Sequence, residues 1–245
     1  MHIEVAKFIL VAGEMLLTSG AEVYRAEETM ERMGAALGYN VEAFVTPTGI
    51  LLTVSYQGEF FTKVRRIRYR TQNLGRIAGV NAISRGLSMG TLTFEEAKAK
   101  LQELRVPAYS TGQKLIAVMV ASGSLTFILG GSGWEIIIAA LSGLIAYSVG
   151  FILERFNANS YLSSSLASFL VANCVYTAQV LLPNISVPTV LVGGLMVLVP
   201  GVAMASAVKD IVQGELLSGT SRAVEAIAIA GALAAGSAIA LGLWR

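Results

Sequence analysis

The pattern of hydrophobic and polar positions divides the chain into two unlike parts. Over the first 110 residues, apolar positions recur with short helical or alternating periods, and polar residues fall between them. The helical periods predict four helices, from Val5 to Leu16, from Val23 to Leu37, over about 71–87, and from Phe94 to Leu104. Ser19-Gly20-Ala21-Glu22 predicts a capping box at the start of the second helix, and Thr93–Glu96 predicts one at the start of the fourth.

Between the second and third of these helices, the sequence becomes rich in β-branched and aromatic residues. Segments 41–45 and 50–56 flank the turn-like sequence Thr46-Pro47-Thr48-Gly49, and a second turn at Gln57-Gly58 leads into segment 60–68. Three short strands joined by such turns predict an antiparallel meander. We therefore expect residues 1–110 to form an α+β domain in which helices cover a small sheet.

From residue 111 onward, the chain consists mainly of long apolar runs. Each run is close to the ~20 residues that an α-helix needs to cross a bilayer. The predicted spans are 115–131, 134–153, 161–182, 187–207 and 223–243. Residues 111–245 are therefore expected to form an all-α membrane domain of five transmembrane helices.

Composition and charge agree with this division and predict an orientation. Hydrophobic residues make up 54% of the chain, more than an ordinary soluble protein carries, and residues 1–111 hold 13 of the 18 Lys and Arg. Two of the predicted loops carry no Lys or Arg, whereas the other two carry Arg155, and Lys209 with Arg222. Because the chain also starts without a cleavable signal pattern, we expect a cytoplasmic N-terminal domain and a C-terminus outside the plasma membrane.

The segment between the fourth and fifth predicted spans is the main functional candidate. It holds Asp210, the single aspartate of the chain. The candidate transport residues in and beside this segment are Pro200, Gly201, Asp210, Glu215, Ser218, Gly219, Arg222 and Glu225. Charges lodged between membrane helices are costly, which favours a functional role, and Pro200-Gly201 is expected to break the fourth helix. The structural alternative is a polar loop whose Ser218, Thr220 or Ser221 caps the fifth helix.

A second group of polar side chains lies inside the third predicted span. The group comprises Asn173, Tyr176, Thr177 and Gln179. Four polar residues within seven positions suggest the lining of an internal cavity, although hydrogen bonding between packed helices is an equal alternative.

Two polar features of the first part have both a functional and a structural interpretation. The basic run Lys63–Arg70 suits anionic lipid headgroups or an anionic substrate, but charge also protects the edge of a sheet. Glu22, Arg25, Glu27 and Glu28 at the start of the second helix suit a ligand or an interface, but acidic residues also favour a helix N-terminus.

Several enzyme and binding classes find no support in the residues. The chain has one cysteine, Cys174, and one histidine, His2, which argues against a disulfide, a histidine-based metal site and a Ser-His triad. It contains neither a nucleophile elbow nor a phosphate-binding loop. We therefore expect neither an enzyme nor a cofactor, metal or nucleic-acid site.

Three motifs resemble those of the threonine/serine exporter family, and the similarity covers nearly the whole chain. Leu16–Arg25 followed by Gly38 resembles the amino-terminal signature, and Phe44–Ile50 resembles the strand-turn motif. The polar residues of 199–225 stand where the family has its most characteristic motif, with Glu215 at a position where aspartate is common. This order of motifs identifies the chain as a member of that family.

The resemblance implies a cytoplasmic domain joined to a membrane exporter half in a bacterial inner membrane. Shorter members of this kind resemble one half of a two-component exporter, and some such pairs are associated with succinate export. The substrate is therefore open between threonine or serine and a small dicarboxylate. The expected partners are the bilayer and a small membrane-protein subunit or a second copy of this chain. Proton coupling through Asp210 or Glu215 is one hypothesis, and a membrane-tethered sensor that gates a partner channel is another.

Overall fold

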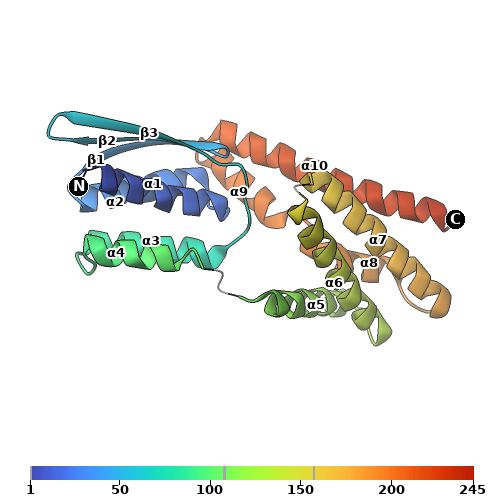
Figure 1. Ribbon diagram of the computed structural model, residues 1–245. Helices are drawn as coiled ribbons and strands as arrows, with labels where there is room; N and C mark the ends of the chain where they lie inside the picture. The colour runs from blue at the N-terminus through green and yellow to red at the C-terminus, as the bar shows by residue number, and fades with distance from the viewer. Residues whose placement is uncertain (1, 107–108, 157) are drawn as a thin grey trace. The chain divides into compact units, whose positions relative to one another are not determined.

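The computed structural model describes residues 2–106, 109–156 and 158–245 (Figure 1). Contacts between residues divide the chain into two compact units. The first comprises Met1–Pro107 with Val202–Val224, and the second comprises Ala108–Gly201 with Glu225–Arg245. The division after 107 lies close to the predicted boundary at 110. The short segment 202–224 packs with the first unit, although its first residues belong to the predicted fourth span.

The first unit combines helices with a small sheet. Its elements are α1 (His2–Thr18), α2 (Val23–Ala36), β1 (Asn40–Thr46), β2 (Gly49–Tyr56), β3 (Glu59–Arg66), α3 (Leu74–Ser88), α4 (Phe94–Glu103), α9 (Gly201–Val212, which begins at the division) and the start of α10 (Leu216–Leu243). The strands form an antiparallel sheet in the order β1-β2-β3, which confirms the predicted meander. The sheet lies over α1 and α2, and α3 and α4 pack on the other side of these helices (Figure 1).

The core of this unit follows the predicted periods. On β2, Ile50, Leu52 and Val54 are buried, whereas Leu51 between them is exposed, as expected for a strand with one covered face. The predicted capping box at α4 is also present, since Thr93 and Glu96 exchange backbone and side-chain hydrogen bonds.

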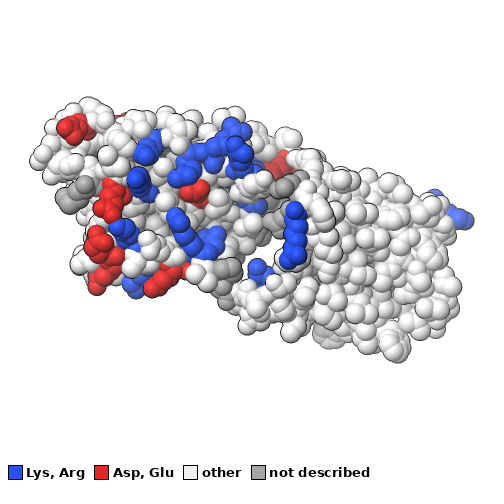
Figure 2. Space-filling model, in the orientation of Figure 1, with Lys and Arg blue, Asp and Glu red and all other residues white. Residues whose placement is uncertain are grey.

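The second unit consists of long apolar helices. Its elements are α5 (Thr111–Ile128), α6 (Trp134–Arg155), α7 (Ser160–Leu181), α8 (Val187–Leu195), the 3₁₀ turn η1 (Met196–Leu198) and the rest of α10. In the described part of the chain, four helices are long and apolar enough to cross a membrane, or five if α8–η1 and α9 form one bent span. Charged residues gather over the first unit and are rare over the second on the face that Figure 2 shows.

Small residues allow the helices of the second unit to approach closely. A Cβ atom on Gly143 would collide with Ser122, and one on Gly193 would collide with Thr126. On α10, a Cβ atom on Gly236 would collide with the backbone of Ser165. The small and hydroxyl residues of the predicted spans therefore include several that pack helix against helix, as expected for a membrane bundle.

Two local predictions at the fourth and fifth spans have different outcomes. The chain does leave helical conformation at Val199-Pro200, as the Pro-Gly pair predicts. The predicted cap of the last helix by Ser218, Thr220 or Ser221 is wrong, because α10 already begins at Leu216. The hydroxyl of Thr220 instead donates to the carbonyl of Leu216 within the helix.

Candidate functional site

The turn between α1 and α2 forms one side of the candidate site. Gly20 adopts a φ of 88°, which favours glycine, and the Ala21 amide donates to the Leu16 carbonyl at 3.0 Å. This turn ends α1 and directs the first amides of α2 toward the hairpin formed by α9 and α10. The α1–α2 turn and residues 202–224 of the hairpin both belong to the first unit.

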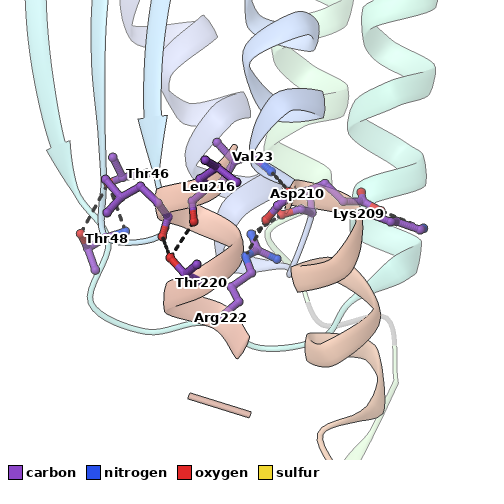
Figure 3. A network of polar contacts seen from close by, with 11 residues as sticks. Val23, Thr46, Thr48, Lys209, Asp210, Leu216, Thr220 and Arg222 are labelled. Atoms are coloured by element: carbon purple, nitrogen blue, oxygen red, sulfur yellow. Dashed lines mark hydrogen bonds and ion pairs between the residues drawn. The ribbon is translucent and has the colours of Figure 1, made fainter. Parts of the chain in front are cut away.

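Asp210 on α9 accepts a hydrogen bond from the start of α2. Its side chain is fully buried, and its Oδ1 accepts from the Val23 amide at 3.2 Å (Figure 3). The unpaired amides and the dipole of a helix N-terminus both favour a carboxylate there. Asp210 therefore caps α2 from a position 187 residues away in the sequence.

This contact corrects the predicted capping box at Ser19–Glu22. Glu22 is the N-cap residue of α2 but makes no side-chain cap hydrogen bond, and the buried Ser19 hydroxyl has no hydrogen-bond partner among the described residues. Because Asp210 supplies the acceptor, the local Ser-x-x-Glu pattern is not needed for capping.

Arg222 on α10 joins Asp210 to the same turn. Its Nε lies 3.3 Å from Asp210 Oδ2, and its Nη2 donates to the Ala21 carbonyl at 2.6 Å. The side chain is only 6% exposed. Taking both charges out of water is costly, so the pair depends on its mutual attraction and on the Val23 and Ala21 hydrogen bonds.

A second ion pair lies beside the first and is more exposed. Lys209 Nζ lies 3.0 Å from Glu22 Oε1, and Arg25 lies 4.0 Å from the other oxygen of Glu22. Burial raises the pKa of the Glu22 carboxyl, but hydrogen bonds to its own backbone and to Lys209 outweigh burial and hold the pKa below its usual value. The two motifs thus form one buried ion pair, Asp210–Arg222, and one more exposed group in which Glu22 lies between Lys209 and Arg25.

The Glu22 pair predicts a pH-dependent contribution to stability. Because the folded-state pKa is below the ordinary value of 4.5, the contribution is present above that value and lost as pH falls through the folded pKa. Lys209 is 61% exposed, so we expect Glu22→Gln to cost about 1 kcal/mol at neutral pH. Thermal unfolding of the full chain at pH 7 and pH 4 measures this. A difference between the variant and the parent that grows toward pH 4 would contradict it.

Glu215 follows the turn that ends α9. Gly214 adopts a φ of 91°, and the Glu215 amide donates to the Asp210 carbonyl at 2.9 Å. The negative charge of the Glu215 side chain disfavours the ionised form of Glu27 on α2. The Glu27 carboxylate accepts a hydrogen bond from the Val45 amide at 2.7 Å. Burial, with a smaller effect from Glu215, raises the pKa of the Glu27 carboxyl. The α9–α10 hairpin therefore places the Glu215 carboxylate close enough to α2 to affect Glu27.

Ser218 and Gly219 lie at the close contact between α9 and the start of α10. Both are buried, and a Cβ atom on Gly219 would lie 2.8 Å from the Ala207 carbonyl oxygen. Backbone at this distance cannot move aside easily, so only glycine fits.

We expect Gly219→Val to separate the hairpin and to lower both the amount of folded protein and export several-fold. The matched control is Gly231→Val on the same helix, where an added Cβ atom meets nothing within 4 Å. Yield of monodisperse protein from membranes measures the effect. Equal yields of the two variants would show that the close contact is not required.

The remaining transport candidates occupy other positions. Pro200 and Gly201 lie at the break before α9, and a Cβ atom on Gly201 meets nothing within 4 Å, so packing does not explain this glycine. Glu225 lies one turn beyond Arg222 on α10, in the second unit. The transport roles of the whole candidate set stay predictions.

The polar group on α7 is engaged in contacts within the second unit. Asn173 accepts from Trp244 Nε1 at 2.9 Å and donates to the Phe169 carbonyl at 2.8 Å, and Tyr176 stacks on Trp244. Thr177 donates to the Asn173 carbonyl, and Gln179 is exposed. Two of these contacts lie within α7 and two join α7 to Trp244 after α10, and the lining of a cavity by this group stays a prediction.

Sequence reasoning missed the partners of Asp210, Arg222 and Glu22. The missing residues are Ala21, Val23 and Lys209, and two of them contribute only backbone atoms, which no pattern of side chains reveals. The available signal was the presence of two distant motifs, 16–25 and 199–225, in one chain. The structure shows that these two motifs bind each other.

Comparison with known proteins assigns the chain to a family. Residues 7–244 match the model of the ThrE family, described as "Putative threonine/serine exporter". The chain belongs to the threonine/serine exporter family. As a member of this exporter family with four or five candidate spans, it is a multi-pass inner-membrane protein with a transport role.

Two curated relatives extend over nearly the full chain. The chain is 27% identical over 250 residues to the "Probable succinate transporter subunit YjjP" of Escherichia coli (strain K12), covering 98% of this chain and 94% of the relative. It is 25% identical over 234 residues to the protein of the same name from Klebsiella aerogenes, covering 94% and 90%. No solved structure shows a significant match to this exporter.

Proposed function

We propose that this exporter carries small carboxylate-bearing metabolites and loads them at the Asp210–Arg222 pair. The observation that carries the proposal is the burial of this pair within the family's most characteristic motif. A buried guanidinium is a strong site for a carboxylate because it offers two parallel N–H donors. In the structure that position is occupied by the carboxylate of Asp210.

Proton coupling follows from charge balance at this pair. If a substrate carboxylate replaces Asp210 at Arg222, an ionised Asp210 would remain buried without its cation, which is costly. Uptake of one proton by Asp210 removes that charge, and release of the proton lets Asp210 return to Arg222 after the substrate leaves. In this scheme the substrate carboxylate and the proton are bound together and leave together, which couples movement of the substrate to movement of a proton.

The same step would loosen the hairpin from the first unit. A protonated Asp210 that has left Arg222 is a weaker acceptor for the Val23 amide, so the cap of α2 weakens. The break at Val199-Pro200 then offers a position at which α9 can change its angle to α8.

Substrate and partner are proposed from the relatives. The family description favours threonine or serine, and the two curated relatives are named as succinate transporter subunits. Both classes carry the carboxylate that Arg222 would bind. The word subunit in those names supports a two-component exporter in which a small membrane protein completes the path.

Export assays with and without the partner test the proposal. Proteoliposomes that contain this chain with a candidate small membrane subunit are loaded with labelled succinate, threonine or serine. We expect release of at least one of them to be stimulated by a proton gradient and abolished without this chain. Release of none of the three under any gradient would contradict the proposed substrate class.

A further inference from the structure

The first unit has a basic groove that is lined by residues outside the candidate transport motif. The groove has a volume of about 500 Å³. Its lining residues are Val11, Glu14, Met15, Arg65, Arg76 and Arg105, from α1, β3, α3 and the chain after α4. None of them belongs to the Asp210–Arg222 network. We propose that this groove binds a small soluble dianion, with two negatively charged oxygen groups on a short skeleton.

Arg76 is held in position by the end of α4. Its Nε donates to the Leu104 carbonyl at 3.0 Å, and its Nη2 lies 3.5 Å from the Arg105 carbonyl. These contacts use two of the five N–H donors of the guanidinium. A half-buried arginine fixed by backbone carbonyls keeps its full charge at the groove, since carbonyls do not neutralise it.

The charges of the lining leave an excess of two. Arg65 Nε lies 3.4 Å from Glu14 Oε2, so one arginine has an internal counter-ion. Among the residues that the structure describes, neither Arg76 nor Arg105 has an acidic partner within 4.0 Å. Three arginines around one groove repel each other, and folding alone does not require them there. A bound dianion would balance the charge.

Size and surroundings favour a small soluble ligand. A volume of about 500 Å³ lies within the usual range of small-molecule sites. A smaller pocket of about 140 Å³ shares Val11 and Arg105 with it, and its other lining residues are the apolar Phe8 and Leu101 and the polar Glu4, Lys7, Lys98 and Gln102. That neighbour can take the carbon skeleton of a metabolite. Lys and Arg gather on this face of the first unit (Figure 2), which would draw anions toward the groove.

Binding by the full chain in an uncharged detergent tests the proposal. Titration calorimetry at pH 8 uses succinate and inorganic phosphate as dianionic probes and acetate as the monoanion. We expect at least one dianion to bind at least tenfold more tightly than acetate, and higher salt to weaken its binding. Equal binding of acetate, or no binding of either dianion, would overturn the proposal. So would stabilisation by anionic lipid nanodiscs alone, which would assign the groove to headgroups.

Variants separate this groove from the transport site. Arg105→Gln removes an exposed charge and should weaken dianion binding at least tenfold without changing the thermal midpoint. The matched control is Arg66→Gln, next to Arg65 on β3 but outside the lining, which should bind as the parent does. Inorganic phosphate has no carboxylate and is not a substrate of the proposed transport, so a failure of the transport proposal leaves the phosphate result unaffected. Loss of binding in Arg66→Gln, with Arg105→Gln unaffected, would place the ligand elsewhere.

Discussion

Replacing Arg222 by glutamine is expected to abolish export and to destabilise the first unit strongly. The change leaves Asp210 buried without its cation, and removing one partner of a buried ion pair costs about 3–5 kcal/mol. It also removes the hydrogen bond to the Ala21 carbonyl, which holds α10 to the α1–α2 turn. Thermal unfolding of the full chain in detergent and export from proteoliposomes measure the two effects.

A second variant separates stability from transport at Arg222. In Asp210→Asn/Arg222→Gln both charges are gone, so most of the lost stability should return, while export should stay absent because no cation meets the substrate. Arg245→Gln, at the exposed C-terminus, is the matched control for removing one arginine. Export at the parental rate by the double variant would show that Arg222 does not bind the substrate.

Asp210→Asn is expected to uncouple export from the proton gradient. Asparagine can still accept from the Val23 amide, so the cap of α2 is retained, but it cannot take up or release a proton. Because the change also leaves Arg222 buried without its anion, export is measured per amount of folded protein. Net export against a substrate gradient should fall at least tenfold. Export measured at several internal pH values tests this, since the residual flux should no longer depend on pH.

The control for Asp210→Asn lies on the same segment. Gln213→Asn changes an exposed side chain just beyond the end of α9 and should leave both the rate and its pH dependence unchanged. Full proton-coupled export by Asp210→Asn would remove this aspartate from the mechanism and leave it a structural role as the cap of α2.

Local patterns predicted the elements of this protein well because each element is encoded by its own residues. The alternation of Ile50, Leu52 and Val54 defines a strand wherever the sheet lies, and the apolar runs define spans by length alone. The break at Pro200 was also predictable, since proline lacks the amide that a helix interior requires.

The partners of the candidate site were not predictable in the same way. Asp210 binds the Val23 amide, and Arg222 binds the Ala21 carbonyl. Because both partners are backbone groups, no side chain of the α1–α2 turn indicates these contacts in the sequence. The Ser19–Glu22 pattern even predicted a local cap that the distant aspartate replaces. For the same reason, sequence periodicity extended the fourth span to residue 207, whereas α9 packs with the first unit from Val202 onward.

Hydrogen–deuterium exchange at the α1–α2 turn tests the central claim most directly. The reconstituted exporter, with its candidate partner, is measured with and without saturating substrate, and peptides covering residues 19–26 report the Val23 amide. If substrate displaces Asp210 from Arg222, exchange in this segment should accelerate at least severalfold in the parent, while the core of β2 stays unchanged. Equal exchange with and without a transported substrate would contradict the account, because the hairpin would then remain bound to the turn throughout export.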